Sequence, residues 1–373
     1  IKGTVPVMVG NDNLKWERTG NLDLGLDFSL FNERLSVTTD YYYKRTTDLL
    51  LNASLATSTG YLNAYKNIGV VVNKGLEFTL NTVNVNTKRF NWTSNFNIAF
   101  NINKIEELNG DQPSLITRVT NWNANFNNSL PYIALPGRQV ALFYGYVFDG
   151  LYPLSDFNVL SNGGYELKAE VPNNGSARSV IKPGFIKYKD INGDGVVDAN
   201  DQTIIGNPNP KHIGGFSNNF RYGQFDLNVF LQWSYGNDIL NANRIVLEGA
   251  EARPSLNMFK TYENRWSLDN QNSILPVAGG YGPNVFSNRN IEDGSFIRLK
   301  TVSLGYNLSS ELMKKLKIQS ARIHVSAQNL ATWTNYSGMD PEVSVRHSAL
   351  TPGFDWSAYP RARTITLGMN LTF

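Results

Sequence analysis

The chain has 373 residues, a formal net charge of +3 and no cysteine. The small and mixed charge argues against a dedicated nucleic-acid-binding protein, and the lack of cysteine excludes disulfides, thiolate metal ligands and a cysteine nucleophile. No run of about 18 apolar residues exists, so a transmembrane helix is excluded, whereas membrane-crossing strands, which show only a period of two, are not.

The first residues lack a secretion leader, because residues 1–4 (IKGT) include neither a starting Met nor a basic segment followed by an apolar stretch. We expect either that a leader has been removed or that the chain is part of a longer polypeptide. The strand count given below favours the second explanation.

Segments that alternate apolar and polar residues recur along the chain, and each is about as long as a tilted strand that crosses a bilayer. They lie at about 22–30, 35–43, 76–80, 90–102, 225–235, 321–327 and 363–373. The last segment runs to an aromatic residue, Phe373, at the end of the chain. One apolar and one polar face per strand is the pattern of an outer-membrane β-barrel.

The connections between these segments alternate in length. Short ones lie at 32–33, 86–88, 136–138, 223–224 and about 309–319, and long ones at about 52–66, 108–128, 153–212, 241–293 and 337–360. Outer-membrane barrels have tight periplasmic turns and long extracellular loops. If every tight turn lies in the periplasm, the alternation requires a short strand before Pro136 and another at about 139–152. The ten connections then separate eleven strands, and residues 1–13 lie outside the cell.

Eleven strands leave two unpaired edges, which lipid does not tolerate. We therefore predict an all-β fold: a transmembrane antiparallel barrel of about 22 strands with a plug in its lumen, of which residues 1–373 form the C-terminal half. The plug and the first strands lie outside this sequence.

The long connection at 153–212 contains residues 190–201 (DINGDGVVDAND), which have the spacing of an EF-hand-type calcium loop. Oxygen side chains fall at positions 1, 3, 5, 9 and 12, glycine falls at position 6, and position 7 offers a backbone carbonyl. The predicted ligands are Asp190, Asn192, Asp194, Val196, Asp198 and Asp201. Because position 12 is Asp rather than Glu, its shorter arm suits the loop type found in dockerins. We expect a structural role for the calcium; the alternative is a turn that holds no metal.

Other candidate residues favour structural roles. His324 lies on the polar face of its strand, which predicts a position facing the lumen, and His212 and His347 have no ligand pattern near them. Aromatic residues of the loops suit sugar or peptide ligands, but an interfacial girdle or loop packing explains them better. These are Trp122, Tyr132, Trp266, Tyr281, Trp333, Tyr336, Trp356 and Tyr359. Segments 244–251 and 258–266 have partly helical patterns, and they could pack on the outer rim of the barrel or contact a partner protein.

Several segments, taken together and in this order, resemble the SusC/RagA-like branch of TonB-dependent outer-membrane transporters. They are 13–17 (NLKWE), 40–44 (DYYYK), 67–69 (NIG), 73–77 (NKGLE), 143–146 (FYGY), the calcium-type loop followed by 205–211 (IGNPNPK), 293–300 (DGSFIRLK), 326–330 (SAQNL) and 340–342 (DPE). The resemblance implies active import of a bulky nutrient, an oligosaccharide or a peptide, across the outer membrane of a Gram-negative cell. It also implies a SusD-like surface lipoprotein as a lid, and the TonB complex as the energy source acting through the missing N-terminal part.

Two other functions stay open at this point. One is a soluble calcium-dependent carbohydrate-binding β-protein, which leaves the lipid-type strand faces unexplained. The other is a TonB-dependent siderophore transporter without a lid. No catalytic set can be argued from residue spacing, so an enzyme is not expected, and no substrate-binding residue can be assigned.

Overall fold

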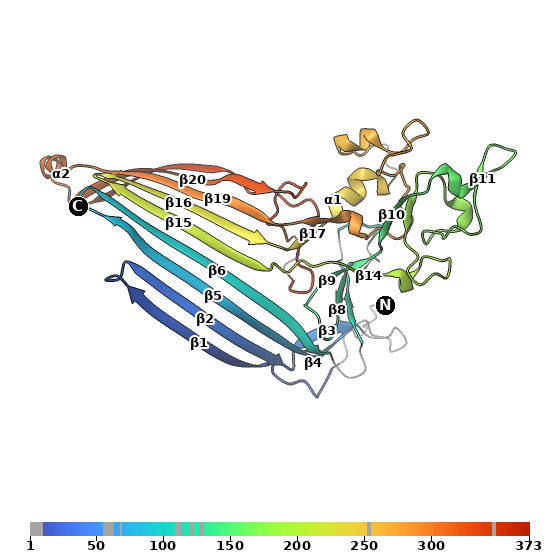
Figure 1. The fold of residues 1–373 in the computed structure, drawn as a ribbon, viewed down its shortest axis with the longest axis horizontal. Coiled ribbons are helices and arrows are strands. Elements are labelled where there is room, and N and C mark those ends of the chain that lie inside the picture. Colours follow the sequence, from blue (N-terminus) through green and yellow to red (C-terminus); the bar gives the residue numbers. More distant parts are fainter. Residues whose placement is uncertain are drawn as a thin grey trace, which may run out of the picture.

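The computed structural model describes residues 10–54, 63–67, 69–108, 113–119, 122–126, 130–251, 255–344 and 348–373. Its largest element is a nine-stranded antiparallel sheet, here called the wall, in the order β1-β2-β5-β6-β15-β16-β19-β20-β22 (Figure 1). These strands are β1 (Arg18–Leu30), β2 (Leu35–Thr47), β5 (Val70–Asn86), β6 (Phe90–Glu107), β15 (His212–Tyr222), β16 (Phe225–Tyr235), β19 (Phe296–Asn307), β20 (Ser320–Thr334) and β22 (Thr364–Thr372).

The register of the wall collects the alternating residues on two separate faces. One row of directly paired residues, apolar throughout, runs Phe28, Val37, Leu80, Phe96, Phe216, Leu231, Leu299 and Ala331. The adjacent row, on the opposite face, runs Asp27, Thr38, Thr79, Asn97, Gly215, Gln232, Arg298 and Thr332. A one-residue slip would exchange the faces, so the residue pattern specifies the register strongly.

The apolar face is left uncovered within the described structure. Ile297 and Leu304 lie on β19, which has wall strands on both sides, yet they are 50% and 44% exposed. A contiguous apolar surface of this extent is not stable against water. The predicted alternation and the antiparallel barrel-type sheet are therefore confirmed.

The prediction of eleven wall strands is wrong: β6 pairs directly with β15, and the wall has nine strands in the described chain. The strands expected around Pro136 exist as β8 (Tyr132–Ala134) and β9 (Leu142–Gly145), but they are three and four residues long and belong to a separate sheet. The sequence predicts that the turn at 136–138 is a tight turn at the short-turn end of the wall. It lies instead against Ile105 near the far end of β6, where Gly137 N donates to Ile105 O at 2.8 Å.

The remaining turns and connections keep the predicted alternation. Short turns join β1 to β2, β5 to β6, β15 to β16 and β19 to β20, all at the end of the wall where the C-terminus lies (Figure 1). The long connections, 48–69, 108–211, 236–295 and 335–363, lie at the opposite end, and their described residues are here called the cap. The connections expected at 108–128 and 153–212 are parts of a single one. The short-turn end also holds helix α2 (Ser310–Leu316), between β19 and β20.

The cap is built of small elements. Its strands are β3 (Leu50–Ser54), β4 (Asn63–Asn67), β7 (Leu115–Thr117), β8, β9, β10 (Phe148–Leu151), β11 (Phe157–Val159), β12 (Tyr165–Leu167), β13 (Ile186–Tyr188), β14 (Thr203–Gly206), β17 (Asp238–Asn241), β18 (Ile291–Asp293) and β21 (Phe354–Asp355). Its helices are α1 (Ala242–Ile245), the π-helical turn η5 (Val246–Ala250) and the 3₁₀ turns η2 (Leu154–Asp156), η3 (Arg178–Val180), η4 (Ala199–Asp201), η6 (Lys260–Asn264) and η7 (Asn288–Asn290). No helix of the described chain is long and apolar enough to span a membrane.

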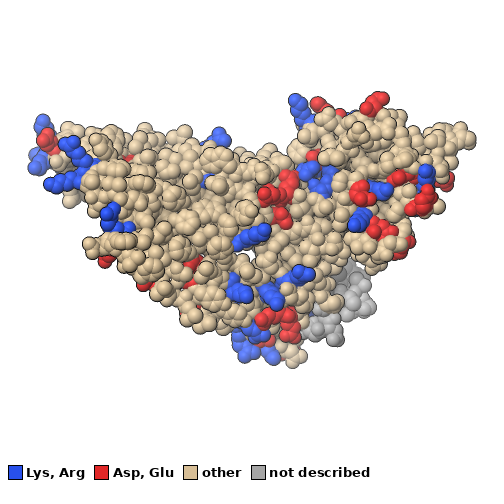
Figure 2. Space-filling model, viewed as in Figure 1, with Lys and Arg blue, Asp and Glu red and all other residues tan. Residues whose placement is uncertain are grey.

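The cap has its own apolar core. The largest cluster of buried apolar side chains draws its members only from the long connections, with Tyr132, Phe143, Ile245, Tyr281 and Phe354 at its centre. Charged side chains follow the same division, since Figure 2 shows them gathered over the cap and the short-turn end and sparse along the middle of the wall. The cap is thus a packed body carried by the wall, and not a set of independent loops.

Candidate functional site

The calcium-type loop is shaped by its own side chains. Asp190 accepts hydrogen bonds from the backbone N–H of Gly193 and Gly195, both at 2.7 Å. Asp194 accepts from Val196 N at 2.9 Å. Gly193 and Gly195 have φ angles of 76° and 83°, a left-handed conformation that side chains with a Cβ disfavour. The glycines therefore allow the chain to coil around the carboxylates.

The end of the loop is closed by a capping box. The carboxylate of Asp198 accepts from Asn200 N at 2.7 Å, and the carboxylate of Asp201 accepts from Asp198 N at 2.8 Å, around the 3₁₀ turn η4. Asp201 is fully buried, and its other oxygen accepts from Ile191 N at 2.8 Å. Asp201, the last residue of the loop, thereby holds Ile191 at the start of the loop.

The donor set of this loop fits a hard cation. In the part of the chain that the structure describes, none of the four loop carboxylates forms an ion pair with Lys or Arg. Each carboxylate accepts from backbone N–H groups, which use one lone pair of an oxygen and leave others free. The described side chains do not converge into a group of three or more acidic or histidine ligands, so binding requires them to turn inward.

Val197 attaches the loop to the core of the cap. Val197 is buried in the main apolar cluster, and its N–H donates to Asn173 Oδ1 at 3.1 Å. The neighbouring Tyr146 is buried as well, and burial raises its pKa to about 12, which keeps the phenol neutral at physiological pH. A change of loop shape would therefore reach the cap core through residues 197–202.

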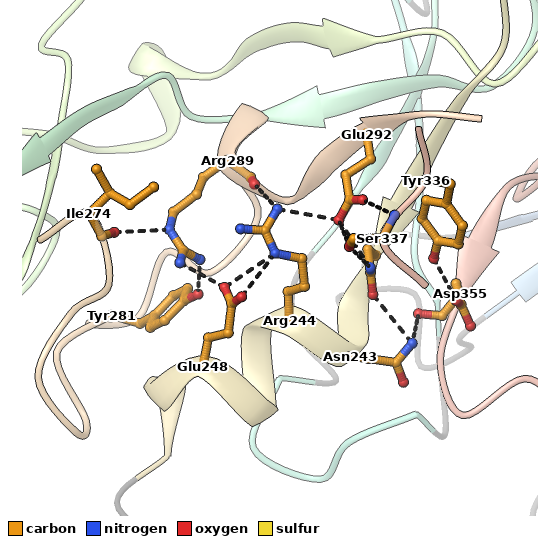
Figure 3. A network of polar contacts seen from close by, with 11 residues as sticks. Asn243, Arg244, Glu248, Ile274, Tyr281, Arg289, Glu292, Tyr336, Ser337 and Asp355 are labelled. Carbon is orange, nitrogen blue, oxygen red and sulfur yellow. Dashed lines mark hydrogen bonds and ion pairs between the residues drawn. The ribbon is translucent and has the colours of Figure 1, made fainter. Parts of the chain in front are cut away.

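A buried ionic network fastens the elements of the cap (Figure 3). Glu248 of η5 binds Arg244 of α1 at 3.2 Å and Arg289 of η7 at 2.7 Å. Arg244 also binds Glu292 of β18 at 3.2 Å. Arg289 donates to the hydroxyl of Tyr281 at 2.5 Å. The Glu248 and Arg289 side chains are only 6% and 4% exposed, so the pairing compensates charges that water does not reach.

The same network extends to the connection between β20 and β22. Glu292 accepts from Ser337 N at 2.8 Å and from Ser337 Oγ at 2.9 Å. The Tyr336 hydroxyl donates to Asp355 Oδ2 at 2.5 Å. Burial, followed by the bond to Asp355, raises the pKa of Tyr336 far above its ordinary value. Two long connections, 236–295 and 335–363, are thus held as one unit.

A second cluster attaches this unit to the wall. Arg298 of β19 is almost fully buried and binds Asp340 at 2.6 Å and Glu342 at 3.0 Å. Arg361 binds Glu342 from the other side at 3.1 Å. Burial acts to raise the pKa of Asp340, but hydrogen bonds from Glu342 N and Arg298 outweigh it, so that the pKa lies below its ordinary value.

One cavity of the cap combines aromatic and polar lining. It has a volume of about 810 Å³ and is lined by Phe259, Met339 and Tyr359 together with Asn243 and Asp355. Tyr359 is 92% exposed. An apolar surface with a few placed polar groups is the usual lining of a ligand site.

The other residues singled out by sequence lie as follows. His324 is on the polar face of β20, opposite Gly305 and Gly368, as predicted. His212 stacks on Tyr235 at the rim of the apolar face with 5.0 Å between ring centroids, and His347 lies outside the described residues. Loop packing is confirmed for the aromatic residues that are buried in the cap: Trp122, Tyr132, Trp266, Tyr281 and Tyr336. The partly helical segments are confirmed as α1, η5 and η6.

Sequence reasoning missed the ionic clusters. Glu248 and Arg289 are 41 residues apart in the chain, and Tyr336 and Asp355 are 19 residues apart, so no local spacing predicts these contacts. The segments around Arg298 and Asp340 carry a family resemblance, but no charge pattern in the sequence predicts that the two residues pair. The one sequence feature that indicates a buried ion pair is Arg298 itself, a charged residue among apolar ones at the start of a strand.

Comparisons with known proteins agree with this architecture. The family model described as "TonB dependent receptor-like, beta-barrel" matches residues 3–200. TonB-dependent receptor P3 of Formosa agariphila is 35% identical over all of this chain and 36% of its own length. TonB-dependent receptor SusC of Bacteroides thetaiotaomicron is 28% identical over 97% of this chain and 32% of its own length.

The fold also matches a solved structure. A chain of the RagAB peptide transporter superposes with a TM-score of 0.77 and 24% identity, covering 98% of this chain and 36% of that one. The chain thus spans about a third of the length of the relatives it matches. The wall, its alternating faces and the family match together show that the chain belongs to the TonB-dependent receptor-like β-barrel family and contributes strands of that barrel.

Proposed function

We propose that the protein imports a bulky nutrient, an oligosaccharide or a peptide, across the outer membrane of a Gram-negative cell. The TonB complex supplies the energy, and a SusD-like surface lipoprotein covers the cap as a lid. The observation that carries the proposal is the apolar face that continues across the paired strands of the wall. Membrane hydrocarbon accounts for that face, whereas a soluble carbohydrate-binding protein would have to cover it.

In this mechanism each region has a separate task. The apolar face anchors the wall in lipid, and the polar rows of Asn, Asp, Ser and Thr line a wet lumen around a plug. The ionic clusters hold the cap rigid, so that it presents one shape to the ligand and to the lid. The cavity between Phe259 and Tyr359 is a candidate ligand contact, because aromatic rings beside amide groups suit both sugars and peptides.

The first test follows membrane location, lid and energy source in the full-length protein. We expect it to require detergent for extraction, to co-purify with a lipoprotein, and to lose uptake when a protonophore removes the proton gradient. Release without detergent would contradict the membrane proposal. Intact uptake without any lipoprotein would instead favour a siderophore-type transporter that works without a lid.

We further propose that calcium binds the loop of Asp190, Asn192, Asp194, Val196, Asp198 and Asp201 and stiffens it. Four carboxylates without a described cationic partner support this proposal. A bound ion stabilises the folded loop by an amount that grows with the logarithm of the calcium concentration relative to the Kd, and this amount is about 2.7 kcal/mol at a hundredfold excess.

The second test is limited proteolysis with and without a chelator. We expect chelation to speed cleavage of the native protein within 153–212. The double variant D190A/D194A should be cleaved fast in both conditions and should dock the lid more weakly, while the barrel still assembles. The matched control is D149A/E170A, which removes two exposed carboxylates from the same connection. Equal cleavage of native protein with and without chelator would contradict the metal site.

A further inference from the structure

The short-turn end of the wall has a positively charged rim. Figure 2 shows Lys and Arg gathered at this end, which is opposite the cap. The cationic residues of these turns are Arg34, Lys88, Arg89, Lys314, Lys315 and Lys317, against the acidic residues Glu33 and Glu311. All eight are exposed, so the excess positive charge faces the surroundings of the protein.

Backbone hydrogen bonds join the turns into one continuous edge. Val83 N donates to Arg34 O at 2.8 Å, which links the first two turns. Gly223 N donates to Arg89 O, and Asn307 N donates to Gln224 O, both at 2.9 Å. The cations therefore project from a fixed rim, and their relative positions do not depend on flexible loops.

Within the described part of the chain, no ion pair neutralises the cations of the rim. Across the described ranges, neither Lys88 and Arg89 nor the three lysines of the α2 region form an ion pair. Lysines in the last turn of α2 stabilise the helix through its dipole. That explanation does not extend to Lys88 and Arg89, which lie in a turn between strands.

A band of aromatic residues lies next to the rim on the apolar face. Tyr222 pairs with Phe225, and Phe225 pairs with Tyr306, with 4.8 Å between the last two ring centroids. Exposed Tyr and Trp mark the boundary between hydrocarbon and head groups. Helix α2 begins four residues after Tyr306 and exposes Leu312 beside its lysines. The rim thus lies at the level of lipid head groups.

We propose that this rim binds the phosphate groups of anionic phospholipids. Helix α2 lies at the membrane surface, where Leu312 contacts acyl chains and Lys314, Lys315 and Lys317 reach the head groups. A lysine ammonium is a compact charge that suits phosphate, and its long stem can lie along apolar surface. The inference rests on the membrane location proposed above, but not on the substrate, the lid or the calcium.

The test is a lipid titration of the full-length protein in a neutral detergent, followed by native mass spectrometry. We expect phosphatidylglycerol to bind more tightly than phosphatidylcholine, and added salt to weaken it. The variant K314Q/K315Q/K317Q should lose at least about tenfold in affinity for phosphatidylglycerol, because each surface lysine contributes about fivefold. Its affinity for phosphatidylcholine should not change.

The matched control is K15Q/K182Q/K260Q, which removes three exposed lysines at the other end of the molecule and should keep the native preference. Circular dichroism verifies that both variants are folded. Equal binding of the two lipids by native protein, an unaffected rim variant, an equal loss in the control, or displacement of lipid by inorganic phosphate would each overturn the proposal. Because lipid retention is measured without uptake, loss of transport with lipid preference intact would count only against the proposed import.

Discussion

The wall and the cap bury their apolar side chains in opposite directions. The wall places them outward in rows such as that through Phe96 and Leu231, whereas the cap turns them inward around Tyr132 and Phe354. The ion pairs differ in burial as well: the pair Arg45–Glu106 of the wall is 45% and 35% exposed, whereas the pair Arg289–Glu248 of the cap is 4% and 6% exposed. The comparison teaches that one chain can combine a region with apolar side chains on its surface and a region with apolar side chains in its core, because each region has its own residue pattern.

The substitution with the largest expected effect should destabilise the cap and leave the wall folded. Glu248→Ala removes the carboxylate between Arg244 and Arg289; Arg244 keeps Glu292, whereas the buried Arg289 is left without an acidic partner among the described residues. We expect a loss of about 3–5 kcal/mol in the stability of the cap. Proteolysis rates in 236–295 measure it, while heat-modifiable migration of the barrel should not change.

The matched control is Asp48→Asn, which removes the partner of Arg18 in a pair whose arginine is 75% exposed. Exposed pairs contribute only about 0–1 kcal/mol. If both substitutions had equally small effects, the cap would not depend on its buried network.

The second substitution breaks the wall and spares the cap. Val229 lies on the apolar face of β16, and Val229→Arg should cost about 2–4 kcal/mol of membrane stability if the position is near the middle of the bilayer. Asn228→Arg, one residue away on the polar face, should be tolerated much better. Urea unfolding in lipid vesicles compares the two. Equal costs would mean that the two faces meet the same environment.

The substitution with the smallest expected effect tests the contact between the cap and the wall, and its effect depends on pH. Asp340→Asn weakens the contact with Arg298, and we expect a loss of about 1.5–3 kcal/mol at neutral pH. Because the folded pKa of Asp340 is lowered, its contribution is fully present above the ordinary aspartate pKa of about 4 and disappears as the pH falls through the lowered value. The native protein and the variant should therefore converge in stability in acid. A constant difference down to that range would show that charge is not the cause.

Sequence reasoning was reliable where the signal is local. Alternation along β1, β16 or β22 identifies a strand and both of its faces without knowledge of its partners. The coiling of residues 190–201 was likewise readable, because glycine and aspartate spacing is local, although the ion itself stays a prediction.

The prediction failed where partners decide the structure. β8 and β9 are apolar and flank a Pro-Gly turn, like a hairpin of the wall, but they are too short to cross a bilayer and pair within the cap. The Glu248 network could not be found either, because only its Arg244–Glu248 pair is local in sequence, and Arg289 and Glu292 are brought to it by tertiary packing.

The direct pairing of β6 with β15 has a consequence for evolution. The insert between Asn103 of β6 and Asn209, just before β15, begins and ends at neighbouring points, because Asn103 Nδ2 donates to Asn209 Oδ1 at 2.8 Å. The entropy cost of closing a loop between these two points grows only slowly with the length of the loop. Related proteins can therefore carry different inserts at this position. Such an exchange would alter ligand recognition while the strand register of the wall is kept.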